Sequence, residues 1–450
     1  MKHASRNTKK DSAAAAAAAI RAEARHLMNT YKRPPVVFTH GKGCYLYDQD
    51  GRAYLDFLGG IAVNALGHAH PRVVRTIRRE AGRAIHFSNL YHNPFQGPLA
   101  AKLAEWSGLD RVFLTNSGTE AVEGALKLAR LHARKAAGSA EHPPHKFLAL
   151  ENSFHGRTFG AVSITATAKY REPFAPLVPG AEFVKFNDLE DLSAKFDSSV
   201  CAIVMETIQG EGGIHPVSEE FYKLARKLAT HYGAALIADE IQCGLGRTGR
   251  PFAYQKFAAS REMRPDIVTV AKPIAGGLPL GAMIAREEFA QAFTPGVHGT
   301  TFGGGPLVCA VALEVLSTIE EENLMENVRE RGEEICVGLA ELALRYDSIR
   351  QIRGEGLMLG MELDFDGTSC VEDALAERLL INCAHEHTLR LLPAFITGSR
   401  QVGEFLNRME TVMSKSHHKS RTAASATNAA ANVPAAAPPP AYAGAHAEEG

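Results

Sequence analysis

A single lysine, Lys272, lies between two apolar segments of the chain, and this setting suggests carbonyl chemistry. Residues 266–270 have the composition of a short buried strand, and Gly276 and Gly277 turn the chain into a second apolar run, 280–285. A lysine removed from water has a lowered pKa, so part of its amine is neutral and able to condense with an aldehyde. A lone lysine at a strand end more often extends to solvent. The hypothesis therefore depends on the residues that accompany Lys272.

Two carboxylates follow apolar strands elsewhere in the chain. Strands are predicted at 200–206 and 234–239, ending in Glu206 and Asp239, with a helix at about 219–231 between them. Alternating strands and helices favour a mostly parallel sheet covered by helices on both faces, and ligands bind at the carboxyl ends of such strands. Glu206, Asp239 and Lys272 would all lie at that edge. Of the neighbours Asp239 and Glu240, only one can face the site.

A phosphate-binding turn is predicted between a strand at 111–115 and the helix that follows it. Ser117, Gly118 and Thr119 precede or begin this helix, where backbone N–H groups and hydroxyls can hold an anion. Ser and Thr are also the ordinary first residues of any helix, so the pattern alone is ambiguous. It gains weight only if a phosphorylated ligand is implied independently.

A loop after the predicted strand 146–150 brings together Phe154, His155 and Arg157. Phe154 could stack on a planar ring, and Arg157 could hold a carboxylate through two parallel hydrogen bonds. A surface loop with a structural phenylalanine explains this segment equally well when it is considered alone. Its place directly after a strand is where α/β proteins commonly position ligand contacts.

Two glycine-rich segments and one buried arginine complete the candidates. Gly244 to Gly249 matches the dinucleotide pattern G-x-G-x-x-G, but Arg250-Pro251 follows and no helical pattern opens there, so a glycine-rich loop is preferred. The loop 298–306 carries the hydroxyls of Thr300 and Thr301, which suit an anion, although a hinge would look the same. Arg390 lies within an apolar strand, which argues against an unpaired surface role.

Composition limits the class of protein. The chain has 450 residues, 45% of them hydrophobic, and Lys plus Arg number 49 against 50 Asp plus Glu, which disfavours a nucleic-acid partner. No apolar run approaches the roughly 20 residues of a membrane span. The seven cysteines are odd in number and contain no C-x-x-C pair, which favours a reducing compartment. The histidines of GHAHP at 67–71 lack a third ligand nearby, so no metal site is predicted.

These pieces together require a planar aromatic aldehyde that carries a phosphate, and pyridoxal 5'-phosphate meets every requirement. The chain also resembles the class III pyridoxal-phosphate aminotransferases, and within them the acetylornithine aminotransferases. The resemblance covers roughly residues 30–413 and rests on NSGTEA, FHGRT, ETIQGEGG, LIADEIQCGLGRTG, AKPIAGGLPLGA, HGTTFGG and IRGEGLMLG, which occur in the family's order and spacing.

The resemblance implies fold type I of the pyridoxal-phosphate-dependent transferases: an α/β fold with a large, mostly parallel sheet domain and a smaller C-terminal α/β domain. The expected boundaries are a flexible tail at 1–29, a hairpin segment at 30–66, the large cofactor-binding domain at 67–300, the small domain at 301–414 and a disordered Ala/Pro-rich tail at 415–450. The expected assembly is a homodimer with shared active sites. The expected location is the cytoplasm, or the mitochondrial matrix if the source is eukaryotic.

The resemblance also implies a role for each site residue. Lys272 would hold the cofactor as a Schiff base and move the proton, and Asp239 would pair with the ring nitrogen. Arg157 would bind the α-carboxylate of the amino donor, and Arg390 the other carboxylate of 2-oxoglutarate, with Glu211 pairing to Arg390 in between. The remaining cofactor contacts would come from Ser117, Gly118, Thr119, Phe154, His155, Glu206, Gln242 and, from a neighbouring subunit, Thr301; Ile61 and Thr300 would contact substrate.

The implied reaction moves the terminal amino group of N2-acetylornithine to 2-oxoglutarate. Ornithine aminotransferases have a tyrosine that recognises the free α-amine where this chain has Ile61, which favours a donor with a masked α-amine. Succinylornithine, an acylated lysine, ornithine and 4-aminobutyrate remain alternative donors, and a nicotinamide-dependent oxidoreductase using GLGRTG is a remote one. The chain departs from the family at Thr207, Pro273 and Gly305, where Pro273 could change how Lys272 moves.

Overall fold

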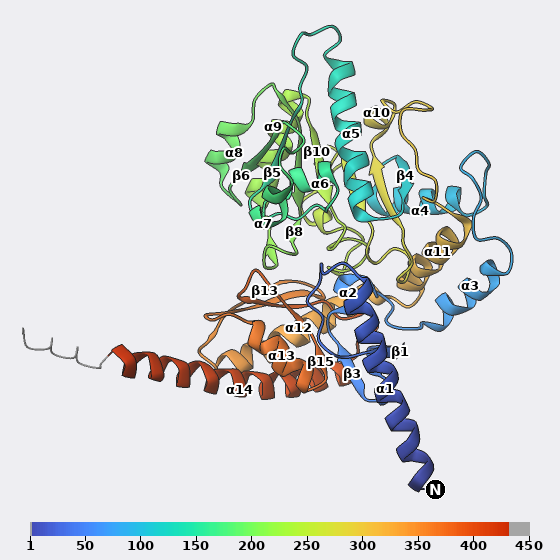
Figure 1. Ribbon diagram of the computed structural model, residues 1–450. Coiled ribbons are helices and arrows are strands. Elements are labelled where there is room, and N and C mark those ends of the chain that lie inside the picture. Colours follow the sequence, from blue (N-terminus) through green and yellow to red (C-terminus); the bar gives the residue numbers. More distant parts are fainter. Residues whose placement is uncertain (1, 432–450) are drawn as a thin grey trace, which may run out of the picture.

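The computed structural model describes residues 2–431, and Figure 1 shows a large α/β domain above a smaller one. The centre of the large domain is a seven-stranded sheet with the order β4-β12-β11-β10-β7-β5-β6. β10 is parallel to both β7 and β11, whereas β12 runs antiparallel to β11 and to β4. The strands are β4 (Arg111–Thr115), β5 (Lys146–Leu150), β6 (Ala181–Val184), β7 (Val200–Glu206), β10 (Ala235–Asp239), β11 (Ile267–Val270) and β12 (Gly281–Ala285).

Alternate residues of the central strands enter two different apolar cores. In β10, Ala235 and Ile237 pack in the cluster that contains Leu128 of α5 (Gly118–Ala136), while Leu236 and Ala238 pack in the cluster that contains Phe221 of α9 (Glu219–Tyr232). Both faces are covered, so the strands are apolar throughout, as the sequence predicts. The other helices of this region are α3 (Pro71–Ala81), α4 (Gln96–Ser107), α6 (Phe159–Ser163), α7 (Ala168–Arg171), α8 (Leu189–Lys195), α10 (Glu287–Ala290) and α11 (Pro306–Glu321), with 3-10 turns at Glu172–Phe174 and Ala253–Lys256 and a small ribbon of β8 (Ile208–Gln209) and β9 (His215–Pro216).

The smaller domain combines the two ends of the chain. Its sheet has the order β13-β14-β17-β16, and a second sheet has the order β1-β2-β3-β15, so a C-terminal strand pairs with the N-terminal segment. The hairpin expected within residues 30–66 is therefore part of a four-stranded sheet. The strands are β1 (Phe38–Lys42), β2 (Tyr45–Asp48), β3 (Ala53–Asp56), β13 (Ile349–Glu355), β14 (Met358–Leu363), β15 (Leu379–Leu380), β16 (Asn382–Ala384) and β17 (Thr388–Leu391), and the helices are α12 (Leu324–Ala343), α13 (Thr368–Ala376) and α14 (Ser399–Ala431).

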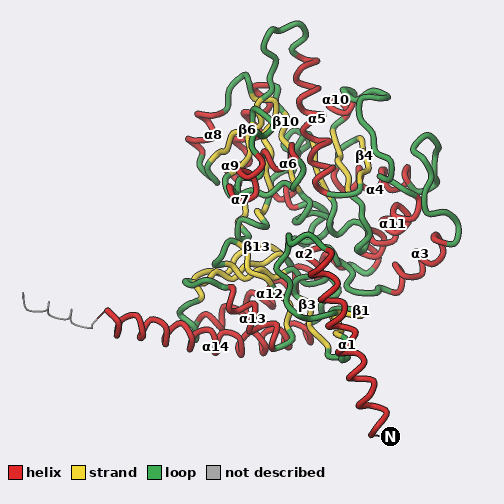
Figure 2. The backbone as a smooth tube through the Cα atoms, viewed as in Figure 1, coloured by secondary structure: helices red, strands yellow, loops and turns green. Residues whose placement is uncertain are grey.

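The terminal segments form helices at both ends. α1 (Lys2–His26) covers most of the predicted N-terminal tail and projects from the body of the molecule, as Figure 2 shows. α14 continues to Ala431, so it includes residues 415–431 of the segment expected to be a disordered tail. Residues 432–450 lie outside the described part, and the domain boundaries stay predictions.

The register of the central strands aligns the chemically active side chains. Asp239 lies opposite Glu206 of β7 and opposite Thr269 of β11. Because parallel neighbours end at the same edge, the ends of β7, β10 and β11 form one ledge, and Lys272 follows β11 by two residues. Among the described residues, no helix is both long and apolar enough to span a membrane.

Candidate active site

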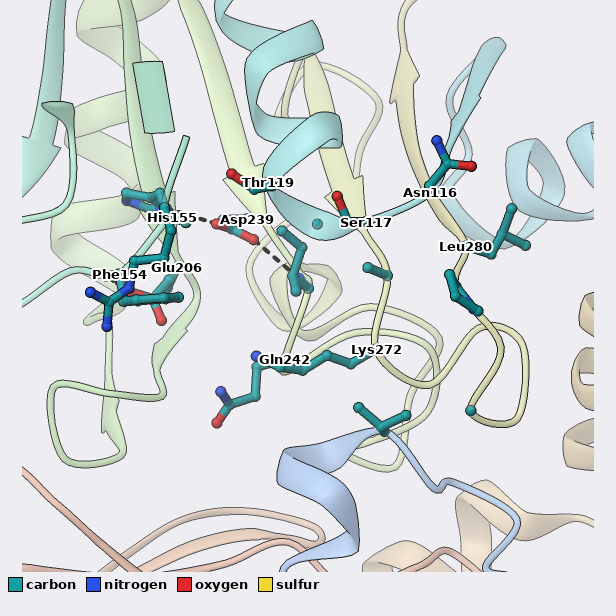
Figure 3. A pocket seen from close by; sticks show the side chains of 18 of the residues that line it. Asn116, Ser117, Thr119, Phe154, His155, Glu206, Asp239, Gln242, Lys272 and Leu280 are labelled. Atoms are coloured by element: carbon teal, nitrogen blue, oxygen red, sulfur yellow. Dashed lines mark hydrogen bonds and ion pairs between the residues drawn. The ribbon is translucent and has the colours of Figure 1, made fainter. Parts of the chain in front are cut away.

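A cavity of about 430 Å³ opens at this ledge, between the central sheet and the small domain. Its size suits a cofactor or small-molecule ligand. Figure 3 shows Lys272 extending across it toward Gln242, below Asp239. The lining combines most of the predicted site with residues of the adjoining turns: Val63, Asn116, Ser117, Gly118, Thr119, Phe154, His155, Gly156, Arg157, Glu206, Ile208, Asp239, Ile241, Gln242, Ala271, Lys272, Gly277, Leu278, Pro279 and Leu280.

Lys272 lies in the turn between β11 and β12, largely enclosed by protein. Burial lowers the pKa of its amine, and the nearby Glu211 carboxylate opposes part of this effect. Gly276 and Gly277 have φ values of 57° and 101°, a backbone that side chains other than glycine rarely adopt, so the tight return into β12 needs both glycines. The turn thus holds a lysine with an increased neutral fraction at the cavity, as the sequence predicts.

Asp239 is 3% exposed and is fixed on both sides by hydrogen bonds. Its Oδ2 lies 2.7 Å from Nδ1 of His155, while Oδ1 accepts hydrogen bonds from the Thr269 hydroxyl at 3.1 Å and from the Ile241 amide at 3.1 Å. Burial lowers the pKa of His155, but its hydrogen bond to Asp239 and the charge of that carboxylate outweigh burial, so the pKa is raised. Three hydrogen bonds therefore hold the Asp239 carboxylate in a fixed orientation at the cavity.

Glu206 is a second buried carboxylate beside this pair. Its two oxygens accept hydrogen bonds from the backbone amides of Phe154 and Gly210, at 2.9 Å each. Burial raises its pKa to about 7, against the charge of His155, while the charge of Asp239 adds to the rise. Glu206 therefore secures the loop that carries Phe154, and near neutral pH it exists partly as the neutral acid.

The start of α5 provides the predicted anion site. Ser117 is the N-cap and its hydroxyl accepts a hydrogen bond from the Glu120 amide at 3.4 Å. The Thr119 hydroxyl lies 2.8 Å from that of Thr158, and Asn116 adds an amide to the rim. A 19-residue helix directs its positive end and free N–H groups at this corner of the cavity, which suits a phosphate.

Arg390, which is buried, and Glu211, which is partly exposed, form an ion pair next to the cavity. Arg390 Nη1 lies 2.6 Å from Oε1 of Glu211 and donates to Oε1 of Gln242 at 3.3 Å. Burial raises the pKa of Glu211, but the charge and hydrogen bond of Arg390, together with the charges of Lys272 and Arg157, outweigh it, so the pKa is lowered. Glu211 thus pairs with Arg390, and two further basic side chains stabilise its negative charge from a greater distance.

The remaining predicted residues lie around the cavity without lining it. Thr300 accepts a hydrogen bond from the Asn116 side chain at 3.3 Å, whereas Thr301 is exposed. Ile61 lies in α2 (Gly59–Ala62), four residues that all have positive φ, and Ile61 itself has φ 62° and ψ 66°. A β-branched side chain rarely adopts this backbone, and such strain is most often found at functional sites.

The sequence did not single out Thr269 and Ile241, which fix Asp239, or Tyr170, whose ring lies beside Arg157. Thr269 is a polar residue within an otherwise apolar strand, and it lies opposite Asp239. A polar residue at such a position could have marked it as part of the site. Nothing in the local pattern distinguishes Tyr170.

Comparison with known proteins assigns the family. The aminotransferase class-III family model matches residues 27–413. The chain belongs to the class-III aminotransferases. It is 43% identical over 393 residues to an acetylornithine aminotransferase of Methanocaldococcus jannaschii, covering 87% of this chain and 97% of that protein.

Solved structures of class-III aminotransferases agree with this assignment. The ornithine aminotransferase of Toxoplasma gondii, reported with partial occupancy of PLP at its active site, superposes with a TM-score of 0.83 at 32% identity, over 88% of this chain and 93% of that one. The acetylornithine aminotransferase of Elizabethkingia anophelis superposes with a TM-score of 0.79 at 30% identity, over 89% of this chain and 99% of that one. The predicted fold type is therefore confirmed.

Pyridoxal 5'-phosphate, the cofactor of class-III aminotransferases, fits the donor set of this cavity. An enclosed lysine with a lowered pKa can hold the aldehyde, a buried carboxylate paired with a histidine can face the ring nitrogen, and a helix start can hold the phosphate. Lys272, Asp239, Ser117, Gly118 and Thr119 are the residues that would do so.

Proposed function

We propose that this aminotransferase transfers the terminal amino group of N2-acetylornithine to 2-oxoglutarate, releasing N-acetylglutamate 5-semialdehyde and glutamate. The observation that supports this substrate most directly is the 43% identity to an acetylornithine aminotransferase over 87% of the chain. When bound, the cofactor withdraws electrons from the carbon that loses a proton and holds the amino group between the two half-reactions. The protein's own residues bind, orient and move protons.

Each side chain has a defined task in this reaction. With the cofactor bound, Lys272 would remove the proton from the substrate carbon as a neutral amine and return it as the ammonium that this forms. Asp239, oriented by its hydrogen bond with His155, would face the ring nitrogen and stabilise its protonated form. Arg157 holds the carboxylate of the donor. Glu211 neutralises Arg390 until 2-oxoglutarate supplies a second carboxylate, so one cavity accepts two substrates of different charge.

A homodimer is part of the proposal. The loop before α4 and the loop before α11 expose several large apolar side chains. A further cavity of about 580 Å³ is lined by residues of both 89–100 and 298–303. Exposed apolar surface of this kind marks a protein interface. In the proposed dimer the partner's loop 298–303 delivers a hydroxyl to the phosphate. The exposed side chains are Ile85, Phe87, Leu90, Tyr91 and Phe302.

The proposed compartment is the cytoplasm. None of the seven cysteines, which all lie in the described part of the chain, forms a disulfide, and five of them are buried. Buried thiols outside disulfides are typical of proteins kept in a reducing environment.

Ornithine is the second candidate donor, favoured by the TM-score of 0.83 to an ornithine aminotransferase. Visible spectra of the purified protein separate the two candidates. Loss of the yellow cofactor band on addition of N2-acetylornithine, and its return with 2-oxoglutarate, would support the proposal. A band that responds to ornithine but not to N2-acetylornithine would replace the donor, and a protein that cannot be loaded with pyridoxal phosphate would overturn the proposed mechanism.

A further inference from the structure

Arg157 is held by an aromatic ring rather than by an acceptor. Its guanidinium carbon lies 3.5 Å from the centroid of the Tyr170 ring and 5.3 Å from that of Phe154. A separation of 3.5 Å is the contact distance of two stacked planes, and a guanidinium meeting the ring edge would lie farther from the centroid. Arg157 therefore lies flat on the face of Tyr170.

The stacked arrangement leaves the hydrogen-bonding edge of Arg157 open. Among the described residues, its guanidinium takes part in no hydrogen bond or ion pair, although it lines the cavity. The five N–H groups of a guanidinium lie in its plane, so stacking on a ring occupies the face and leaves these donors available for a carboxylate. Fixing a free arginine side chain costs about 2 kcal/mol of rotamer entropy. Because stacking on Tyr170 already fixes Arg157, substrate binding does not have to supply this free energy.

Tyr170 is itself held in place from outside the cavity. It lies in α7 (Ala168–Arg171), and its amide donates to the Thr167 carbonyl at 3.0 Å. Its ring meets that of Phe154 edge-to-face, with centroids 6.1 Å apart and planes at 88°. The ring is thereby fixed against an aromatic side chain that also lines the cavity.

We propose that Tyr170 is a positioning residue that determines selectivity for amino donors with an α-carboxylate, by holding Arg157 in its binding orientation. This inference rests on the proposed function, in which Arg157 binds that carboxylate. The contact uses the aromatic face of Tyr170. Phenylalanine should therefore replace it without loss, whereas an aliphatic side chain of similar volume should not.

The test compares the wild-type holoenzyme with Tyr170→Phe and Tyr170→Leu on two donors. N-Acetylputrescine is N2-acetylornithine without the α-carboxylate, so it cannot use Arg157. We expect Tyr170→Leu to lower kcat/KM for N2-acetylornithine about tenfold, mainly by raising KM. A cation–aromatic contact that is partly shielded from water contributes a free energy that corresponds to this factor. Its kcat/KM for N-acetylputrescine should stay unchanged, and Tyr170→Phe should match the wild type on both donors.

An equal loss on both donors would overturn the proposal, because it would mean that Tyr170 acts only by supporting Phe154. Absence of any loss with Tyr170→Leu would also overturn it. If N-acetylputrescine reacts too slowly to measure, a double-mutant cycle decides: in an Arg157→Leu background, Tyr170→Leu should cause no further loss with N2-acetylornithine, and an additive loss would contradict the proposal.

Failure of the proposed function has a different signature. A wild-type holoenzyme that ignores N2-acetylornithine but reacts with glutamate would reject the donor assignment alone. The same variants would then be compared with glutamate, one carboxylate of which would bind Arg157.

Discussion

Arg390 and Glu211 are 179 positions apart in the sequence, yet their side chains form an ion pair in which the arginine is 1% exposed. Neither residue lines the cavity, but Arg390 also contacts Gln242, which does. Glu211 thus occupies the carboxylate-binding position at Arg390, whereas no acceptor among the described residues occupies the one at Arg157.

Replacing Glu211 with glutamine should favour dicarboxylate substrates. Without its anionic partner, Arg390 is available to 2-oxoglutarate and glutamate at all times, so their KM values should fall about tenfold, the strength of a charged hydrogen bond. Half-reactions followed by the cofactor absorbance would measure this. Unchanged KM values for both dicarboxylates would show that the ion pair does not compete with substrate.

Replacing Arg390 with leucine should separate the two half-reactions. The reaction with 2-oxoglutarate should slow by roughly a hundredfold, because a carboxylate loses its paired donors in a site with little water. The reaction with N2-acetylornithine, which uses Arg157, should change only a few-fold. Stopped-flow spectra of each half-reaction provide the comparison, and equal losses in both would argue against separate carboxylate sites.

The lowered pKa of Lys272 predicts how cofactor uptake depends on pH. Only the neutral amine attacks an aldehyde, so the uptake rate should rise with pH and level off once the lysine is deprotonated. Since burial lowers the pKa, the midpoint should lie below that of an exposed lysine, about 10.4. Cofactor-free protein mixed with pyridoxal phosphate across a pH series would report this midpoint.

The Glu211→Gln variant is a matched control for that series. The carboxylate of Glu211 raises the pKa of Lys272, so removing its charge should move the midpoint to still lower pH. A midpoint at or above the ordinary value in the wild type, or an upward shift in the variant, would contradict the electrostatic argument.

Ile61 should be strained in the native state. At φ 62° glycine has no steric penalty, whereas a β-branched residue incurs about 1–2 kcal/mol. Glycine relieves this strain, but its greater freedom in the unfolded chain opposes the gain. We therefore expect Ile61→Gly to leave the unfolding temperature unchanged or slightly raised, and to raise KM for N2-acetylornithine. Ile61→Val, which keeps the β-branch, should differ little from the wild type in both measurements.

Thr207 should stabilise the buried Glu240. Its hydroxyl donates to Oε1 of Glu240 at 2.7 Å, and the same carboxylate accepts from the amides of Ala253 at 2.8 Å and Tyr254 at 2.9 Å. Thr207→Val removes a donor from a fully buried acceptor and should reduce the free energy of unfolding by about 1–3 kcal/mol.

Thr207→Ser is the control for this change, because it keeps the hydroxyl. Burial raises the pKa of Glu240, and the Thr207 hydrogen bond opposes this rise, so the valine variant should raise the pKa further. A group with a raised folded pKa costs stability above its unfolded pKa. The two variants should therefore differ more in their free energy of unfolding, measured by chemical denaturation, as pH rises from about 4 toward neutral. A difference that does not change with pH would contradict a role for the Thr207 hydroxyl in stabilising ionised Glu240.

The sequence alone determined the parts of the site that depend on neighbouring residues. A strand followed by Ser117-Gly118-Thr119 specifies a helix start, and an apolar strand that ends in Asp239 specifies a carboxylate at the edge of a sheet, because turn chemistry and side-chain periodicity are local properties. The alternation of strands and helices along the chain then indicated that these strands are parallel and place their carboxyl ends at one edge of the sheet.

Only the tertiary structure decided which distant side chains meet. His155 pairs with Asp239 across 84 positions, and the ring of Tyr170 stacks on Arg157 because a short helix returns to the cavity. The same limit explains why the sequence predicted a hairpin within residues 30–66 but not the pairing of β15 with it. Such contacts depend on how whole elements pack, and packing is a property of the assembled core that no local pattern contains.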